Sequence, residues 1–577
     1  MLNRSLVTPT FHKECAQRCT STGAFDQKTP RKWNKLTGRP GSARIGEVTD
    51  TFLFLEREAA LTEISLSPSP SPPTELAPLA TPRVKVGFVS LGCPKNLVDS
   101  EVMMGLLNQA GAEMTSSPED ADVLVVNTCS FIDSAKQESV NAILEMAQHK
   151  QNGARRKLGV KLIVAGCLVE RYRDEIRKNI PEVDAVVGTG ELQQILAAAG
   201  LEVPRPTSQP SPFTILTTAG GATAEAMTAT TATSRPEGDL RESQGRFART
   251  EWDGAAPALP QYLYDETTPR LLATPRSSAY IKIAEGCDHP CSFCVIPNLR
   301  GKFRSRRLES VVTEAQRLVA QGVQEITLVG QDTTCYGEDL GLKDGLALLL
   351  DRLARIEGLK WLRFLYAYPN KITSRLLETM ALHANICKYL DVPLQHASPS
   401  VLKNMKRGAG AEIFLKTLEK VRATVPGIAL RTSFIVGFPG ETDADFAVLS
   451  DFVREARFDW LGVFSYSDED GSQAFHHDAK LPQRTIETRR RALMRLQKGI
   501  SKKAKQQWVG RTLDVLVEGE SEETSMLWEA RSQFHAPEID GKVYINDFGV
   551  HEELIPGNFY RCEITEAHEY DVVGRII

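Results

Sequence analysis

Apolar runs alternate with segments of helical spacing over two long stretches of the chain. In the first stretch, helical patterns occur near Asn96–Asn108, Asp133–Gln148 and Glu170–Asn179. The apolar runs span residues 84–93, 122–129, 161–167 and 184–190. Because strands that alternate with helices form parallel sheets, this stretch predicts a doubly wound, parallel α/β domain over residues 83–202.

A second stretch, residues 276–505, contains six further strand candidates with helical patterns between them. The candidates are Tyr280–Ala284, Glu325–Val329, Trp361–Tyr366, Tyr389–Val392, Ala429–Val436 and Trp460–Tyr466. Six βα units predict a partial (β/α)6 barrel, since a complete barrel of this kind has eight strands. An incomplete barrel has a wide lateral opening, which suits a macromolecular substrate.

Residues 506–577 alternate apolar and polar positions in short runs separated by turn residues, which predicts a small C-terminal β-barrel. From Arg511 onward, 15 acidic residues stand against five arginines and lysines. A barrel that binds RNA should be basic, because phosphate contacts dominate affinity for RNA. This barrel is therefore predicted to repel RNA and to attract a basic protein.

Two segments lack the periodicity of a packed domain. Residues 1–82 are rich in Arg, Lys, Ser and Thr and end in a proline/serine spacer, which predicts a disordered extension. A transit peptide, a natural extension and a wrongly chosen start codon all fit this segment. Residues 203–275 read as a low-complexity insertion and linker without a catalytic role.

Composition narrows the class of protein. No apolar run approaches the ~18 residues that a membrane span needs, so an integral membrane protein is excluded. The net charge of -4 gives no general case for nucleic acid. Eleven cysteines in 577 residues, six of them at interpretable positions, indicate metal chemistry in a reducing compartment, and thus a cytoplasmic protein.

Three cysteines, Cys287, Cys291 and Cys294, follow the first strand of the predicted barrel with the spacing CxxxCxxC. Three thiolates at this spacing can hold three irons of a [4Fe-4S] cluster and leave the fourth iron open for chemistry. The alternatives are free thiols or a zinc site with His289 as fourth ligand. Zinc sites usually combine two CxxC pairs or a Cys/His set, so the spacing favours the cluster.

Three more cysteines, Cys93, Cys129 and Cys167, each end one apolar run of the α/β domain. Ligands of parallel sheets gather at the carboxyl ends of the strands, and all three cysteines occupy that edge. A single cysteine there would be read as a small buried hydrophobe. Three at the same topological position predict a second [4Fe-4S] cluster with one open iron.

The CxxxCxxC loop, with the aromatic Phe293 before its last cysteine, resembles the radical S-adenosylmethionine (SAM) enzymes. Together with a three-cysteine α/β domain, it resembles the methylthiotransferases, and residues 506–577 are similar by position to their TRAM domain. The resemblance implies two SAM molecules. One methylates sulfur held at the Cys93, Cys129 and Cys167 cluster; the other yields a radical at the second cluster. No acid–base pair is implied beyond the cluster ligands.

Further residues are predicted to contact SAM. Gly330, Gln331 and Asp332, after the second barrel strand, resemble the family's motif for the SAM amino group, and the segment from Gly437 to Glu441 resembles the lining of the adenosine site. Phe293 on the cysteine loop, with Gln395 and Arg431 on the fourth and fifth βα units, completes the predicted contacts. Arg304, Arg306 and Arg307 either meet the SAM carboxylate or an acidic substrate, or form a solvated helix start.

The substrate is indicated by four longer motifs. They resemble the branch of the family that modifies the β-carbon of an aspartate in ribosomal protein uS12. The motifs are SLGCPKNLVDSE (90–101), EGCDHPCSFCVIP (285–297), GQDTTCYGEDL (330–340) and VPLQHASPSVLKNMKR (392–407). The branch that modifies tRNA adenosine typically has asparagines where this chain has Asp332 and Thr333.

The resemblance covers about residues 84–203 and 276–577. It implies uS12 as protein substrate, a sulfur carrier and an electron donor as partners, and no membrane or direct tRNA binding. Two alternatives stay open: a tRNA adenosine methylthiotransferase, and a non-catalytic iron–sulfur electron-transfer protein. The latter is disfavoured because a carrier has no use for open irons.

Overall fold

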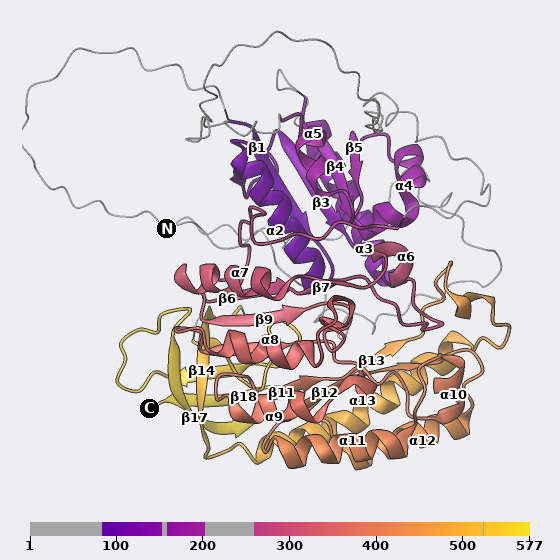
Figure 1. The fold of residues 1–577 in the computed structure, drawn as a ribbon, viewed down its shortest axis with the longest axis vertical. Coiled ribbons are helices and arrows are strands. Elements are labelled where there is room, and N and C mark those ends of the chain that lie inside the picture. The colour runs from indigo at the N-terminus through magenta and orange to yellow at the C-terminus, as the bar shows by residue number, and fades with distance from the viewer. Residues whose placement is uncertain (1–82, 153–158, 202–258, 523, 525) are drawn as a thin grey trace, which may run out of the picture.

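The computed structural model describes residues 83–152, 159–201, 259–522, 524 and 526–577 (Figure 1). The predictions for residues 1–82 and for most of 203–275 lie outside this part of the chain. In Figure 1 an α/β domain lies above a partial barrel, and a small β-barrel lies at one end of the partial barrel. The predicted fold class is confirmed.

The α/β domain is a five-stranded parallel sheet in the order β2-β1-β3-β4-β5. Its strands are β1 (Lys85–Ser90), β2 (Glu113–Thr115), β3 (Val123–Thr128), β4 (Lys161–Gly166) and β5 (Ala185–Val187). Its helices are α2 (Pro94–Gln109), α3 (Asp133–Asn152), α4 (Cys167–Asn179), η4 (Leu192–Gln194) and α5 (Ile195–Ala199). The order reverses between β1 and β3, which makes the space above these two strands the switch point of the sheet.

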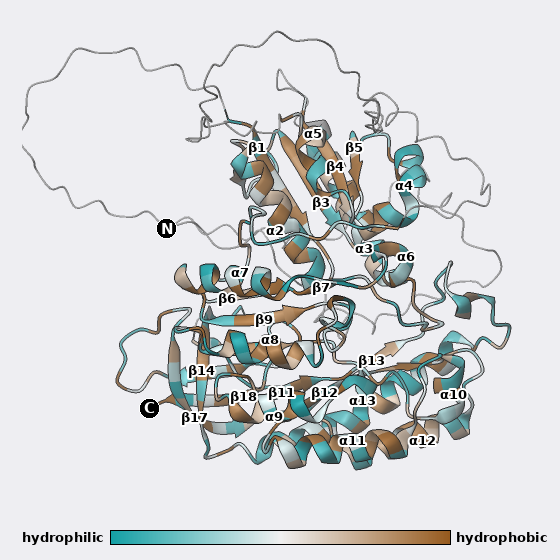
Figure 2. Ribbon diagram, in the orientation of Figure 1, coloured by the Kyte–Doolittle hydropathy of each residue, from teal (hydrophilic) through white to brown (hydrophobic). Residues whose placement is uncertain are grey.

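Alternate side chains of β3 serve the two faces of this sheet. Val123 and Val125 pack in the cluster that contains α2 and α5, whereas Leu124 and Val126 pack in the cluster that contains α3 and α4. Figure 2 shows the central strands as continuously hydrophobic, as expected of a sheet covered by helices on both faces. The doubly wound arrangement therefore follows from the four consecutive apolar residues that begin β3.

The partial barrel has six parallel strands in two three-stranded sheets, ordered β10-β9-β6 and β11-β12-β13. The strands are β6 (Ser278–Lys282), β9 (Glu325–Val329), β10 (Trp361–Phe364), β11 (Tyr389–Asp391), β12 (Ala429–Val436) and β13 (Trp460–Ser465). A single bridge, between Leu362 and Ile386, joins the two sheets. All six strand predictions are met to within two residues at their starts and ends.

Helices cover the outside of these strands. They are α7 (Leu308–Ala320), α8 (Gly345–Ala354), α9 (Ser374–Leu382), α10 (Pro399–Asn404), α11 (Ala411–Thr424), α12 (Asp443–Ala456) and α13 (Gln483–Gln506). Shorter elements are β7 (Ala284–Glu285), α6 (Ile296–Arg300), β8 (Arg304–Ser305), η6 (Glu338–Leu340), η7 (Pro369–Lys371) and η8 (Gln473–His476). Helix α12 begins at a capping box in which Thr442 and Asp445 exchange side-chain and backbone hydrogen bonds. No helix of the described residues is both long and apolar enough to cross a membrane.

The C-terminal domain is a closed barrel in the order β14-β15-β16-β18-β17. Its strands are β14 (Thr512–Glu520), β15 (Trp528–Ser532), β16 (Val543–Asp547), β17 (Phe559–Ala567) and β18 (Val572–Ile576). It packs against the amino ends of the partial-barrel strands. Arg531 pairs with Glu325 at the start of β9 at 2.7 Å, and Trp460 at the start of β13 donates to the Phe534 carbonyl at 2.8 Å.

The α/β domain sits at the opposite end, over the carboxyl ends of the same strands. The predicted linker crosses the boundary: residues 259–277 form neither helix nor strand, and Arg270 within them pairs with Glu101 of α2 and Glu314 of α7. On the far side, Arg171 of α4 pairs at 2.6 Å with Glu469, which follows β13. The carboxyl edges of the sheet and of the barrel therefore face each other.

Candidate functional site

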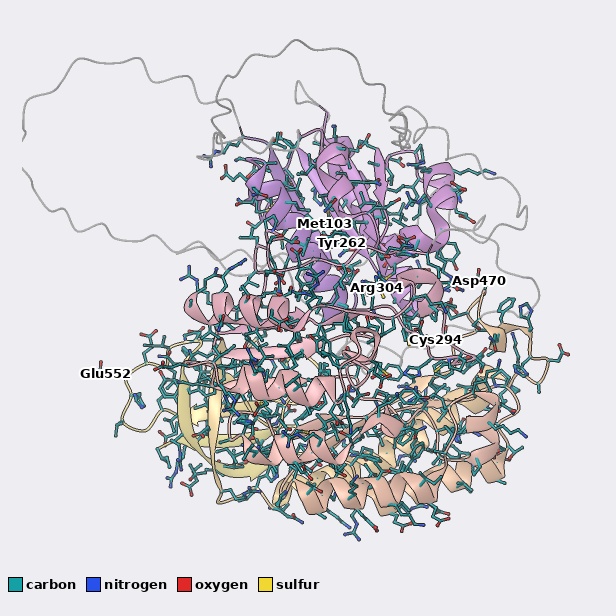
Figure 3. The ribbon with its side chains drawn as sticks, in the orientation of Figure 1. Met103, Tyr262, Cys294, Arg304, Asp470 and Glu552 are labelled. Atoms are coloured by element: carbon teal, nitrogen blue, oxygen red, sulfur yellow. The ribbon has the colours of Figure 1, made fainter. Side chains whose placement is uncertain are left out.

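The loop that carries Cys287, Cys291 and Cys294 leaves the barrel at β7 and returns at β8, which pairs antiparallel with β7. All three residues are free cysteines and are partly exposed. Burial raises the pKa of Cys287 to about 11 and that of Cys294 to about 12, and the Cys291 thiolate adds to both increases. A metal bound here would displace these protons. Figure 3 shows Cys294 at the boundary between the α/β domain and the barrel.

The second set of cysteines lies just beyond the strand ends rather than on the strands. Cys93 immediately precedes α2, Cys129 follows β3, and Cys167 is the first residue of α4. The structure brings the three together: Cys93 and Cys167 lie close enough to Cys129 for their charges, added to burial, to raise its pKa. Gly92, with φ +91°, permits this approach: a Cβ there would lie 2.7 Å from Cβ of Cys129.

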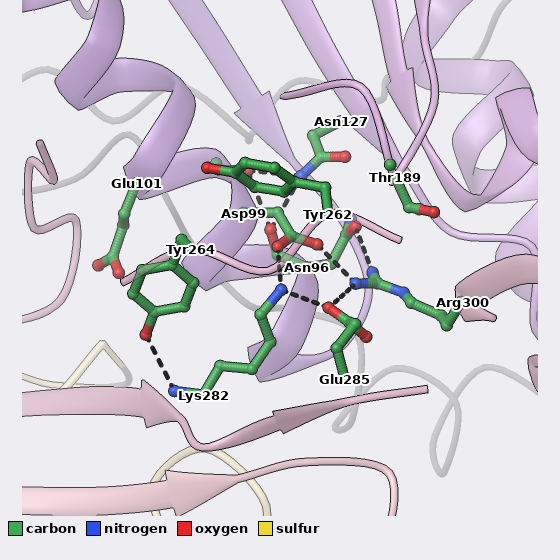
Figure 4. Close-up of polar contacts among 12 residues, drawn as sticks. Asn96, Asp99, Glu101, Asn127, Thr189, Tyr262, Tyr264, Lys282, Glu285 and Arg300 are labelled. Carbon is green, nitrogen blue, oxygen red and sulfur yellow. Dashed lines mark hydrogen bonds and ion pairs between the residues drawn. The ribbon is translucent and has the colours of Figure 1, made fainter. Parts of the chain in front are cut away.

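A buried network of charged side chains lies where the α/β domain meets the partial barrel (Figure 4). Lys282 at the end of β6 forms ion pairs with Asp99 of α2 and Glu285 of β7. Arg300, the last residue of α6, bonds Asp99 at 2.6 Å, and its other nitrogen lies 3.4 Å from Cys167 Sγ. Thus the helix that follows the first cysteine loop reaches the second set.

The charged side chains of this network shift the pKa values of the neighbouring thiols and carboxylates. Burial would raise the pKa of Cys93, but Lys95 and Arg300 outweigh burial and lower it. For Glu285, Lys282 and Arg300 likewise outweigh burial and lower the pKa to about 2. Lys95 and Arg300 therefore favour an anionic Cys93, whereas burial raises the pKa of Cys129 and of Cys167.

The Gly330–Asp332 motif directly follows β9, where the sequence placed it. Asp332 Oδ2 lies 2.6 Å from His289 Nε2 and accepts from Cys335 Sγ at 3.1 Å. Burial would raise the pKa of Asp332, but hydrogen bonds from His289, Thr334 and Cys335 outweigh burial and lower it.

His289, considered above as a zinc ligand, stacks on Tyr368 with ring centroids 3.9 Å apart. Cys335 belongs to this group, since His289, Asp332 and Cys335 present ligand atoms within 4.8 Å of one another. The sequence reasoning missed Cys335, although its position three residues after Asp332 was a signal. His289 thus faces Asp332 beside the cysteine loop.

Gln331 donates to Glu285 Oε1 at 2.8 Å, which links the SAM-type motif to the buried network. Its own carbonyl oxygen, Oε1, is buried without a hydrogen-bond partner among the described residues. A buried acceptor of this kind is available to a ligand that donates a hydrogen bond.

Phe293 packs against an apolar cluster of Val401, Met405, Phe438 and Ala474. The segment predicted to line the adenosine site therefore lies beside the cysteine loop, through Phe438. Gly437 has φ +80°, and a Cβ at this position would lie 2.4 Å from Ile486 Cγ1, so glycine is required.

Arg431 and Gln395 have structural partners. Arg431 is buried in the barrel and pairs with Asp391 at 2.8 Å and with Asp540 of the C-terminal barrel at 3.5 Å. Gln395 has φ +72°, and its backbone bridges to β12. Neither contact tests the predicted SAM contact, which stays a prediction for both residues.

Of the three candidate arginines, two are engaged with the protein itself. Arg304 donates to the carbonyls of Gln261, Tyr262, Arg300 and Lys302. Arg306 is buried and bonds Glu314 and Ser310. Arg307 is exposed at the start of α7. The geometry favours a structural role for Arg304 and Arg306.

A further pair at the boundary was not found from the sequence. Lys95, two residues after Cys93, places its ammonium 3.5 Å from the centroid of the Tyr366 ring. Tyr366 follows β10 and has φ +64°. The lysine in the motif SLGCPKN was the only available signal, and nothing in the sequence showed that it reaches the barrel.

Three family models match this chain. They are the Uncharacterized protein family UPF0004 over residues 85–188, the Radical SAM superfamily over 281–453 and the TRAM domain over 509–577. The solved structure of the radical SAM methyltransferase TsrM from Kitasatospora setae is 17% identical, with a TM-score of 0.43 over 67% of this chain and 72% of that chain. That likeness is too weak to add to the assignment.

Curated relatives match over a longer range. The ribosomal protein uS12 methylthiotransferase RimO of Koribacter versatilis is 67% identical, and the match covers 85% of this chain and 96% of the relative. The protein of the same name from Solibacter usitatus is 56% identical, with 86% and 95% covered. The chain therefore belongs to the RimO family of radical SAM methylthiotransferases.

Proposed function

We propose that this enzyme transfers a methylthio group to the β-carbon of an aspartate in ribosomal protein uS12. The observation that carries the proposal is the reach of Arg300. This residue ends the helix after Cys287, Cys291 and Cys294, yet its guanidinium lies 3.4 Å from Cys167 Sγ. Arg300 therefore connects the helix that follows the Cys287 loop to the Cys93, Cys129 and Cys167 set, which supports a single reaction site between the two cysteine sets.

Each set fits a [4Fe-4S] cluster with one open iron, because each supplies three thiols. When bound, these clusters and SAM supply a hydrogen-abstracting radical and the sulfur that is transferred. Holding each cluster is the task of Cys93, Cys129 and Cys167 on one side and of Cys287, Cys291 and Cys294 on the other.

The chain's other residues bind and orient. The Asp332 carboxylate, with its lowered pKa, offers a negative charge to an amino group such as that of SAM. The unpaired Gln331 Oε1 offers an acceptor beside it. Phe293 and Phe438 form an apolar wall that excludes water from one side of the cysteine loop.

A sulfur carrier and an electron donor complete the set of partners, and a ribosomal substrate places the reaction in the cytoplasm. The acidic C-terminal barrel supports a basic protein over tRNA as substrate. The C-terminal barrel lies at the amino end of the partial barrel. Its charge therefore acts on substrate docking, and the chemistry takes place at the carboxyl end, where the cysteines lie.

The test offers uS12 and tRNA together to the reconstituted enzyme under anaerobic conditions, with SAM, sulfide and reductant. Mass spectrometry then identifies which molecule gains a methylthio group. We expect modification of the uS12 aspartate alone. Modification of tRNA would contradict the substrate, and SAM cleavage without modification of either molecule would contradict the transfer.

A further inference from the structure

Lys95 is a buried cation at the boundary where the two cysteine sets face each other. Lys95 is 9% exposed, and its ammonium nitrogen lies 3.5 Å from the centroid of the Tyr366 ring. Among the described residues it forms no ion pair with a carboxylate, and its partner is the Tyr366 ring. A cation over a ring is stabilised far less than one that meets a carboxylate in a dry site.

The neighbouring buried cations, unlike Lys95, are paired with carboxylates. Lys282 is paired with Asp99 and Glu285, and Arg300 is paired with the same two carboxylates. Arg270 is paired with Glu101 and Glu314. Because a buried charge without a counter-charge costs several kcal/mol, Lys95 is the position in this region where an anion from outside the chain gains most.

The position of Lys95 is also suitable for a substrate. Cys93 lies two residues before it on the chain, and Tyr366 lies directly beyond the carboxyl end of β10. An anion bound by Lys95 therefore lies beside the Cys93 set and above the barrel strands that carry the Cys287 loop. Lys95 and Arg300 both lower the pKa of the Cys93 thiol, so two cations share that one negative charge.

We propose that Lys95 binds the side-chain carboxylate of the target aspartate. This inference rests on the proposed function and adds how the substrate side chain is selected. In aspartate the carboxylate carbon is bonded directly to the β-carbon, so a carboxylate held at Lys95 fixes the reacting carbon one bond away. An asparagine at the same position would leave the lysine charge unpaired and would be rejected.

The test is a double-mutant cycle on binding. Affinity of the holoenzyme is measured for uS12 with its aspartate and for uS12 with Asp→Asn at that position. The enzymes are wild type, Lys95→Met and Lys505→Met. Lys505 is the matched control, because it is also buried and also lies over an aromatic ring, 3.6 Å from the Trp460 centroid, at the other end of the barrel.

We expect wild type and Lys505→Met to bind the aspartate form at least about tenfold more tightly than the asparagine form, the size of a charge-assisted hydrogen bond. In Lys95→Met this preference falls to about one. Equal losses of affinity for both forms of uS12 would mean that Lys95 only compensates the charge of the cluster ligands, which would overturn the proposal. An unchanged preference for the aspartate form would overturn it as well.

Iron content and SAM cleavage are measured on each variant, since Lys95 lies close to a cluster ligand. If Lys95→Met loses iron, carbodiimide coupling of the wild-type complex decides instead. An amide between the Lys95 amine and the target aspartate is expected; coupling of that aspartate only to other lysines would overturn the proposal. Failure of the proposed function differs from both results, because wild type would then bind neither form of uS12.

Discussion

The two ends of the partial barrel both hold buried ion pairs, but they differ in the polar groups that are left free. At the amino end, Glu325 is fully buried and meets both Arg531 and Arg363, so the C-terminal barrel closes that end with paired charges. The carboxyl end also holds paired charges, those of Lys282 and Arg300 with Asp99 and Glu285. Among the described residues, however, its thiols lie free, the Gln331 side-chain carbonyl has no hydrogen-bond partner and Lys95 lies over an aromatic ring. Stability is concentrated at one end and binding capacity at the other, as is usual for barrels.

The largest expected effect comes from removing a thiol of the Cys287 loop at the carboxyl end. In Cys291→Ala we expect SAM cleavage to be lost, because the cluster that binds SAM has two ligands left. Iron falls by about half, from the roughly eight irons of two clusters. Iron analysis and 5′-deoxyadenosine release measure both effects. Loss of all iron would contradict two separate cluster sites.

Cys167→Ala is the reciprocal change in the other set. We expect SAM cleavage to continue and methylthio transfer to uS12 to stop, since only the sulfur-bearing cluster loses a ligand. Mass spectrometry of uS12 measures transfer. Normal transfer by this variant would remove Cys167 from the site.

At the amino end, Glu325→Gln leaves Arg363 and Arg531 buried with a neutral partner. Breaking a buried ion pair from one side costs about 3–5 kcal/mol, so the free energy of unfolding should fall by that amount. Thermal or urea unfolding measures it. Glu412→Gln, whose pair with Lys416 is exposed, is the matched control and should leave the melting temperature unchanged.

Acid should weaken the same end of the barrel. Burial would raise the pKa of Glu325, but Arg531 and Arg363 outweigh it and lower the pKa to about 2. The stabilisation is present above the unfolded value of 4.5 and is lost as the pH falls toward about 2. It amounts to about 3 kcal/mol. The free energy of unfolding, measured across this pH range, should show that loss. In Glu325→Gln the part of the pH dependence that Glu325 contributes should be absent.

Much of this architecture could be predicted from local pattern. The six barrel strands were found because apolar runs such as Glu325–Val329 are buried along their whole length. Strand β2 was missed, because its three residues are mostly polar and partly exposed at the sheet edge. The three cysteines of the α/β domain were found by topology, since parallel strands bring their carboxyl ends to one edge.

Contacts between domains could not be predicted in this way. The sequence left Arg306 between a ligand contact and a solvated helix start, and it predicted a SAM contact for Arg431, which stays a prediction. Their partners Glu314 and Asp540 come from a helix and a barrel that sequence cannot orient. Lys95 was invisible for the same reason, because its partner Tyr366 is contributed by another domain. Periodicity reports which face is buried; it does not report what covers that face.

The reach of Arg300 across the boundary has a consequence for exchanging parts between relatives. Residues 282–300 belong to the barrel by sequence, but Lys282 and Arg300 both bond Asp99 of the α/β domain. A chimera that takes the α/β domain from another species and leaves these residues behind would pair Asp99's replacement with a foreign partner. The natural cut for recombination therefore falls after Arg300, and the cysteine loop travels with the domain that it faces.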